Sequence, residues 1–273
     1  TSGMATDQGK LGNINATGIL AAMRGVSPGE VGTTTFRPFY TPVSFGALAG
    51  ASVGAHAMPA PSSPLHGWAA RNGAVFIDAG LWHRASWFPR AGERTWRESV
   101  DREVRTVREN AGLCDVSTLG KIEVFGPDAA EFLNRLYCNP MLRLPVGKAC
   151  YGLMLREDGM VYDDGTVSRL AEAHFLVTTT TAMAGGVLSH MEFAAQVLWP
   201  ELIVRFLSVS DQWAQMSIAG PKARTILQAV VEDDISDAAV PFLAARAVRL
   251  KGNLRARLFR ISFSGELAYE LAV

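Results

Sequence analysis

The sequence lacks the short motifs that mark nucleotide binding and metal binding. Its 273 residues contain no GxGxxG, GxxxxGKS or GxxxxGKT, so no loop for a nucleotide phosphate is visible. The five histidines form no HxH or HxxxH pair, and we expect no metal site. Cys114, Cys138 and Cys150 are odd in number and form no CxxC pair, which indicates buried or free thiols in a reducing compartment. We therefore expect a cytoplasmic protein.

An excess of either charge is also absent. Lys plus Arg and Asp plus Glu each number 26, so the formal net charge at pH 7 is zero. A balanced chain has no general attraction to nucleic acid or to an anionic membrane surface. Residues 43–60 carry no charged side chain, but Gly, Ala and Ser dominate them and give little transfer energy into lipid. We expect a connector there and no membrane span.

The chain divides into three zones of different composition. Hydrophobic residues make up 48% of it and charged residues 19%, which supports a sizeable core and argues against disorder. Residues 1–49 contain a short helical pattern around Ile19 and Met23, and residues 50–63 are rich in Ala, Gly, Pro and Ser, as linkers are. Residues 64–273 hold the periodic structure. Because the chain begins without Met and ends within a strand-like pattern, we expect a piece of a longer protein.

Residues 95–136 predict a helix, a strand and a second helix. Thr95 and Glu98 have the spacing of a capping box, and we expect the helix they open to end at Gly112. The apolar face of that helix is expected to hold Val100, Val104, Val107 and Ala111. Residues 121–125 alternate as a strand with Ile122 and Val124 inward. After a Gly-Pro-Asp turn, the second helix is expected to bury Ala129, Phe132, Leu133 and Leu136.

This strand, Gly-Pro turn and helix occur twice. EVFGPDAAEFL (123–133) aligns without gaps with SIAGPKARTIL (217–227), and the apolar positions keep their register. Between the copies, residues 174–181 are typical of a strand, followed by a helix with Val187, Met191, Ala194 and Leu198 on one face. The prediction is an α+β fold with a ferredoxin-like duplicated unit, in which both helices cover one side of a mostly antiparallel sheet.

An adjacent carboxylate pair follows a predicted hairpin turn. Asp163 and Asp164 come after EDGMVY, and neighbours in a strand point to opposite faces, so one carboxylate can face inward. The expected partner strand, residues 151–154, offers an apolar wall of Tyr, Gly, Leu and Met. A carboxylate against such a wall can bind N–H groups and stabilise a developing cation. The plain alternative is a solvated turn pair.

Together these motifs resemble the folate-binding aminomethyltransferase family, whose best-known member is the T-protein of the glycine cleavage system. YGLMLREDGMVYDDG (151–165) is similar to the family's Tyr strand, Gly turn and Asp-Asp, and FSGELAYEL (263–271) to its Ser-Gly-Glu segment. The resemblance implies that Asp163 is the catalytic carboxylate and that Glu266 holds the pterin ring of tetrahydrofolate. It also implies that Tyr151 and Leu153 line the same pocket.

The residues before position 50 are unlike T-proteins and resemble the alpha subunits of heterotetrameric sarcosine oxidases. There, a dinucleotide-binding flavoprotein region leads into a T-protein-like half. The resemblance implies beta, gamma and delta subunits as partners, with FMN, FAD and NAD bound in the parent complex and not by this chain alone. Thr34, Thr35 and Arg37 are candidates to face FMN or a partner subunit, although a loop packed on another domain explains them equally well.

The implied reaction is oxidative demethylation of sarcosine, with transfer of the one-carbon unit to tetrahydrofolate. The products would be 5,10-methylenetetrahydrofolate and glycine. Three alternatives stay open: a free-standing T-protein-like aminomethyltransferase, a folate domain like that of dimethylglycine oxidase, and a non-catalytic scaffold of the same fold. The family's later Arg and Tyr ligands and its small β-barrel are not in this sequence.

Overall fold

The computed structural model describes residues 16–27 and 60–273, which belong to two units, Thr1–Pro59 and Ala60–Val273. In the first unit it describes α1 (Ala16–Arg24), which confirms the predicted short helix. Thr34, Thr35 and Arg37 and most of the predicted 50–63 linker lie outside the described residues. Within the described ranges, no helix has the length and hydropathy to cross a membrane.

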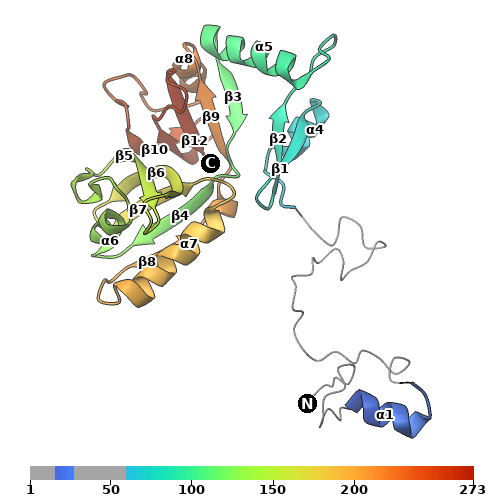
Figure 1. The fold of residues 1–273 in the computed structure, drawn as a ribbon. Helices are drawn as coiled ribbons and strands as arrows, with labels where there is room; N and C mark the ends of the chain where they lie inside the picture. The colour runs from blue at the N-terminus through green and yellow to red at the C-terminus, as the bar shows by residue number, and fades with distance from the viewer. Residues whose placement is uncertain (1–15, 28–59) are drawn as a thin grey trace. The chain divides into compact units, whose positions relative to one another are not determined.

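The second unit contains a hairpin and two five-stranded antiparallel sheets (Figure 1). The hairpin joins β1 (Val75–Ala79) to β2 (Trp82–Trp87) and follows α4 (His66–Arg71). The first sheet has the order β5-β6-β7-β4-β8, with the bounds Lys148–Leu155, Val161–Ala171, His174–Thr179, Gly120–Phe125 and Arg205–Ser208. The second has the order β10-β11-β12-β9-β3, with the bounds Ala245–Leu250, Leu254–Phe259, Ala268–Ala272, Gln215–Ala219 and Gly112–Asp115.

Helices cover the outer face of each sheet. α6 (Ala129–Leu136) and α7 (Ala184–Phe193) share one core with β4, β6 and β7, whereas α8 (Ala223–Gln228) shares another with β9 to β12. A third cluster lies between the sheets and includes Leu176 of β7 and Phe259 of β11. The α+β class is confirmed. The expectation of one sheet with both helices on the same side is wrong, because each copy of the repeated unit stands in its own sheet.

The two copies exchange their leading strands. β3 precedes β4 along the chain but pairs with β9 of the second copy, and β8 precedes β9 but pairs with β4 of the first. The crossing is held by matching hydrogen bonds: the Lys121 N–H donates to Ser210 Oγ at 2.9 Å, and the Gln215 N–H donates to Ser117 Oγ at 2.9 Å. The exchange ties the two sheets into one unit.

The Gly-Pro turn of each copy needs its glycine. Gly126 and Gly220 have φ angles of 134° and 121°, which L side chains rarely adopt. A Cβ at Gly126 would lie 2.2 Å from the Ile203 carbonyl oxygen, and one at Gly220 would lie 2.4 Å from that of Val107. Each turn therefore packs directly against the segment that leads into the exchanged strand.

Gly220→Ala should destabilise this junction by about 2 kcal/mol or more, because the methyl group overlaps backbone that has little room to move. Gly185→Ala is a matched control within α7, where an added Cβ meets nothing within 4 Å and should stabilise by up to about 1 kcal/mol. Hydrogen exchange in the full-length protein should quicken in peptides covering β9 and β12 for Gly220→Ala alone. Unchanged exchange in that variant would contradict the packing argument.

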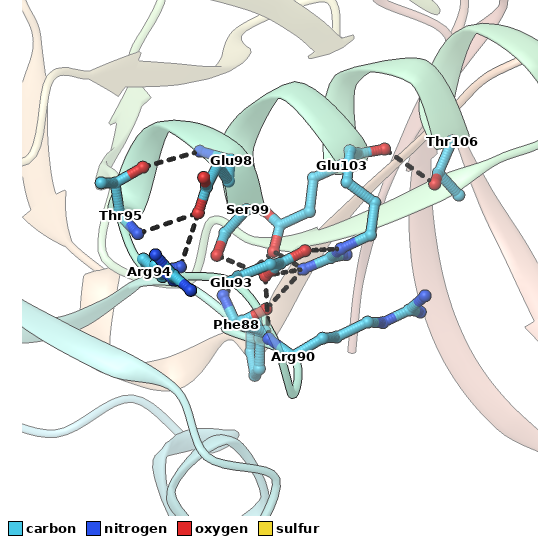
Figure 2. Close-up of polar contacts among 10 residues, drawn as sticks. Phe88, Arg90, Glu93, Arg94, Thr95, Glu98, Ser99, Glu103 and Thr106 are labelled. Atoms are coloured by element: carbon cyan, nitrogen blue, oxygen red, sulfur yellow. Dashed lines mark hydrogen bonds and ion pairs between the residues drawn. The ribbon is translucent and has the colours of Figure 1, made fainter.

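The helix α5 (Trp96–Glu109) has the predicted capping box, shown in Figure 2. Thr95 Oγ1 accepts the Glu98 N–H, and the Glu98 carboxylate accepts the Thr95 N–H. Glu93 lies beside this end, where Arg102 and Ser99 donate to its carboxylate and lower its pKa to about 2. These contacts fix the start of α5.

Three predicted helix details are wrong. α5 ends at Glu109 and not at Gly112, because Asn110 leaves the helical conformation and Gly112 already pairs in β3. Ala111, expected on the apolar face of this helix, therefore lies beyond its end. Leu198 was expected to share one helix face with Val187, Met191 and Ala194, but it is exposed while those three are buried. The last turn, Ala194–Leu198, is a π-helix, so the chain advances by more residues per turn and Leu198 rotates away from the face that holds Met191.

Candidate functional site

Asp163 is a buried carboxylate on β6. It pairs with Met154 of β5 and is 6% exposed. Its Oδ1 accepts the Thr180 hydroxyl at 2.7 Å, and its Oδ2 accepts the Thr180 N–H at 3.2 Å. Burial raises the pKa of Asp163, while the two bonds from Thr180 act in the opposite direction. The carboxylate is thus held by the segment that links β7 to α7.

Tyr151, Leu153 and Asp164 meet on the other face of the same two strands. Leu153 pairs with Asp164 across β5 and β6, and the Tyr151 hydroxyl donates to Asp164 Oδ2 at 2.7 Å. This bond raises the pKa of Tyr151. Tyr151 is 53% exposed and Leu153 36% exposed, so both can reach a ligand. The structure brings these two predicted residues to Asp164 and places Asp163 on the opposite face.

The predicted apolar wall is therefore divided between two faces. Gly152 and Met154 are buried like Asp163, whereas Tyr151 and Leu153 point the other way. The expectation that Asp163 lies against all four residues is wrong in this respect, because side chains alternate along a strand and the β5–β6 register joins Met154 to Asp163. The roles proposed for Asp163, Tyr151 and Leu153 stay predictions.

Sequence reasoning missed two residues beside Asp163. Thr180 lies in a run of four threonines that begins in the last two residues of β7 and continues past it, which is a polar signal at the end of a strand. Tyr137 is 6% exposed, and its pKa is raised by burial and by the charge of Asp163. A Cβ at Gly152 would lie 2.8 Å from the Tyr137 ring, so this glycine lets the ring pack against β5. Tyr137 has no sequence signal beyond its place after α6.

Glu266 lies in the loop that connects β11 to β12 of the second sheet. Its side chain is 12% exposed, and its Oε1 lies 3.7 Å from a guanidinium nitrogen of Arg108. Ser264 Oγ donates to Oε2. The pKa of Glu266 is lowered by this hydrogen bond, by a backbone N–H and by the Arg108 charge. The carboxylate is therefore ionised at neutral pH and can accept hydrogen bonds from a ligand.

Lys121 forms a second buried polar group that the sequence did not reveal. It is 1% exposed although it lies in a strand whose apolar residues Ile122 and Val124 were correctly predicted to be buried. Its Nζ donates to the carbonyl oxygens of Ser117 and Leu119, at 2.9 Å each. Burial lowers the pKa of Lys121 to about 8, although the negative charges of Glu270, Asp115 and Asp211 act to raise it.

A cavity of about 230 Å³ lies near this lysine and away from the predicted site residues. Its walls come from the segment before α4, from β2, and from the two segments that connect β3 to β4 and β8 to β9. The residues that line it are Pro61, Ser62, Pro64, Trp82, Ser117, Ser210, Asp211 and Trp213. None of Tyr151, Leu153, Asp163 and Glu266 lines it. The predicted site residues thus lie outside this cavity, with Tyr151 and Leu153 exposed and Asp163 buried.

Comparison with known proteins places both parts of the chain. The GCVT N-terminal domain profile matches residues 65–273, and the sarcosine oxidase A3 domain profile matches residues 1–51. Sarcosine oxidase subunit alpha of Rhizobium meliloti (strain 1021) is 72% identical over 274 residues, which cover 100% of this chain and 28% of that subunit. An aminomethyltransferase of Corynebacterium aurimucosum is 34% identical over 213 residues, which cover 77% of this chain and 54% of that protein.

A solved structure has the same fold. The glycine cleavage system aminomethyltransferase T from Bartonella henselae matches with a TM-score of 0.62 and 23% identity, over 78% of this chain and 53% of that one. The resemblance seen in the sequence is confirmed, although the chain spans little more than a quarter of the Rhizobium subunit. Because the GCVT profile covers most of its length, the chain belongs to the GCVT N-terminal domain family.

Proposed function

We propose that the full-length protein is the alpha subunit of a sarcosine oxidase and that this GCVT region receives the one-carbon unit. One observation carries the proposal: the A3 match at residues 1–51 and the GCVT match at residues 65–273 stand in one chain that is 72% identical throughout to such a subunit. The parent enzyme acts on a CH–NH donor and works with other subunits, with FMN, FAD and NAD bound elsewhere in the complex. We place it in the cytoplasm.

In this proposal, sarcosine is oxidised at a flavin and tetrahydrofolate supplies the nucleophilic amine that takes up the one-carbon unit. The products are 5,10-methylenetetrahydrofolate and glycine. The side chains present fit a reduced folate. Its pterin carries an amidine-like N–H edge, and an ionised carboxylate such as Glu266 can accept two hydrogen bonds from it. Tyr151 and Leu153 offer exposed aromatic and apolar surface for a ring.

A carboxylate near the reacting nitrogens would stabilise positive charge as the one-carbon unit is transferred. The sequence resemblance assigns this role to Asp163. The strand register favours Asp164 as a second candidate, because Asp164 shares its face with Tyr151 and Leu153. Asp163, which accepts two hydrogen bonds from Thr180 and faces the helix layer, would then hold the β7–α7 connection in place.

Titration of the full-length protein with tetrahydrofolate tests the proposal. We expect saturable binding, and we expect sarcosine oxidation to yield formaldehyde without the folate and 5,10-methylenetetrahydrofolate with it. If the protein oxidises sarcosine but binds no folate, the result would favour the alternative in which this region is a non-catalytic scaffold. Folate binding without a flavin or sarcosine oxidation would favour a free-standing aminomethyltransferase, and activity confined to dimethylglycine would favour the dimethylglycine-oxidase-like alternative.

A further inference from the structure

Glu266 stands at a junction of three segments in the second copy of the repeated unit. The Gly220 N–H donates to the Leu267 carbonyl oxygen at 2.9 Å, which fixes the residue after Glu266. The Lys222 N–H donates to the Asn110 carbonyl oxygen at 2.9 Å, and Lys222 Nζ donates to Asn110 Oδ1 at 2.6 Å. The end of α5, the Gly-Pro turn and the loop before β12 are therefore linked by direct hydrogen bonds.

Arg108 extends from the last turn of α5 to this loop. One of its guanidinium nitrogens lies 3.7 Å from Glu266 Oε1, while Ser264 donates to the other carboxylate oxygen. The Glu266 side chain is 12% exposed and that of Arg108 is 66% exposed, so the guanidinium approaches the carboxylate from its solvent side. With the capping box and Glu93 fixing the other end of α5 (Figure 2), the helix gives Arg108 a stable base.

The first copy of the unit provides an internal comparison for this junction. There the Gly126 N–H donates to the Ala173 carbonyl oxygen at 3.1 Å, as Gly220 does to Leu267. The Asp128 N–H donates to the Ile203 carbonyl oxygen at 3.4 Å, as Lys222 does to Asn110. The backbone connections are thus the same in both copies, which identifies equivalent positions around them.

The side chains at these equivalent positions differ. Glu172 occupies the place of Glu266, but its side chain is 86% exposed and pairs with Arg169, three residues before it. Glu201 occupies the place of Arg108, so the first copy has a second carboxylate where the second copy has a cation. The fold therefore does not need an arginine at this position. The pair of Arg108 and Glu266 is a feature of the second copy, where the predicted ligand carboxylate lies.

We propose that Arg108 is a positioning residue that holds the Glu266 carboxylate, ionised and oriented, for a ligand with adjacent N–H donors such as the pterin edge of a reduced folate. The inference rests on the proposed function of Glu266. In this role Arg108 acts through that carboxylate. With one oxygen directed by Ser264 and the other by Arg108, the carboxylate loses less rotational freedom when the ligand binds.

Tetrahydrofolate titrations of the full-length protein test this role. Glu266→Gln should weaken binding roughly tenfold to a hundredfold, since hydrogen bonds to a charged group are lost. Arg108→Ala should weaken it about threefold to fivefold, as expected for one partly exposed ion pair, and Arg108→Lys should restore most of the loss. In the Glu266→Gln background, Arg108→Ala should have no further effect, because its partner has lost its charge.

Arg97→Ala is the matched control. Arg97 lies on the same helix, is 69% exposed and pairs with Asp101 at 3.3 Å, so its loss should leave folate binding unchanged. If Arg108→Ala binds tetrahydrofolate as tightly as the wild type, the inference is overturned. It is also overturned if Arg108→Ala weakens binding equally in the wild-type and Glu266→Gln backgrounds. If the wild-type protein shows no saturable binding, the proposed function fails instead, which is a separate result.

Discussion

If the proposed function holds and Asp164 is the catalytic carboxylate, Asp164→Asn in the full-length protein should divert the one-carbon product from 5,10-methylenetetrahydrofolate to formaldehyde while sarcosine oxidation continues. The substitution keeps the size of the side chain and removes the negative charge beside Tyr151 and Leu153. A single electrostatic contact to a developing charge contributes on the order of 3 kcal/mol, or roughly a hundredfold in rate. The ratio of the two products during turnover with tetrahydrofolate measures the effect.

Asp163→Asn separates this role from structural support. One amide oxygen cannot replace both acceptor contacts to Thr180, so we expect a loss of about 1–3 kcal/mol in the local stability of the β7–α7 connection. Hydrogen exchange in peptides covering residues 174–187 measures it. If Asp163→Asn shifts the product ratio more than Asp164→Asn, catalysis belongs to Asp163, as the sequence resemblance implies, and the assignment from the strand register is wrong.

Between pH 8 and pH 10.5, the unfolding free energy should rise by up to about 3 kcal/mol through the titration of Lys121. Its folded pKa of about 8 lies below the ordinary value of 10.5, so the unfolded chain binds the proton more tightly. Stability therefore increases as the pH rises through this window. The neutral amine keeps two N–H groups, which match the two carbonyl oxygens of Ser117 and Leu119.

Lys121→Met should remove this dependence on pH. Urea unfolding of the full-length protein and of the variant, followed by tryptophan fluorescence at pH 7.5 and pH 10, gives the comparison. The other lysines and the tyrosines are common to both proteins, so they cancel in the difference. If the unfolding free energy rises equally in the two proteins between pH 7.5 and pH 10, Lys121 does not titrate in this range.

The sequence by itself determined the local elements and the duplication. The Thr95 and Glu98 capping box, the buried face of α6 and the inward Ile122 and Val124 all depend on neighbours a few residues away. Such short-range patterns reflect backbone geometry and side-chain periodicity, which a single sequence displays. The repeated Gly-Pro unit was visible for the same reason. The sequence also indicated that the two adjacent aspartates point to opposite faces.

Only the tertiary structure decided which strands pair and which face each carboxylate shares. β3 pairs with β9 and β8 pairs with β4, so each joins the strand that precedes the other copy's Gly-Pro turn, a choice that depends on contacts far apart in the chain. Likewise, a one-residue slip of β6 against β5 would bring Asp163 to the face that holds Tyr151. Register and partner choice follow from the burial of distant surfaces, so no pattern within a single segment specifies them.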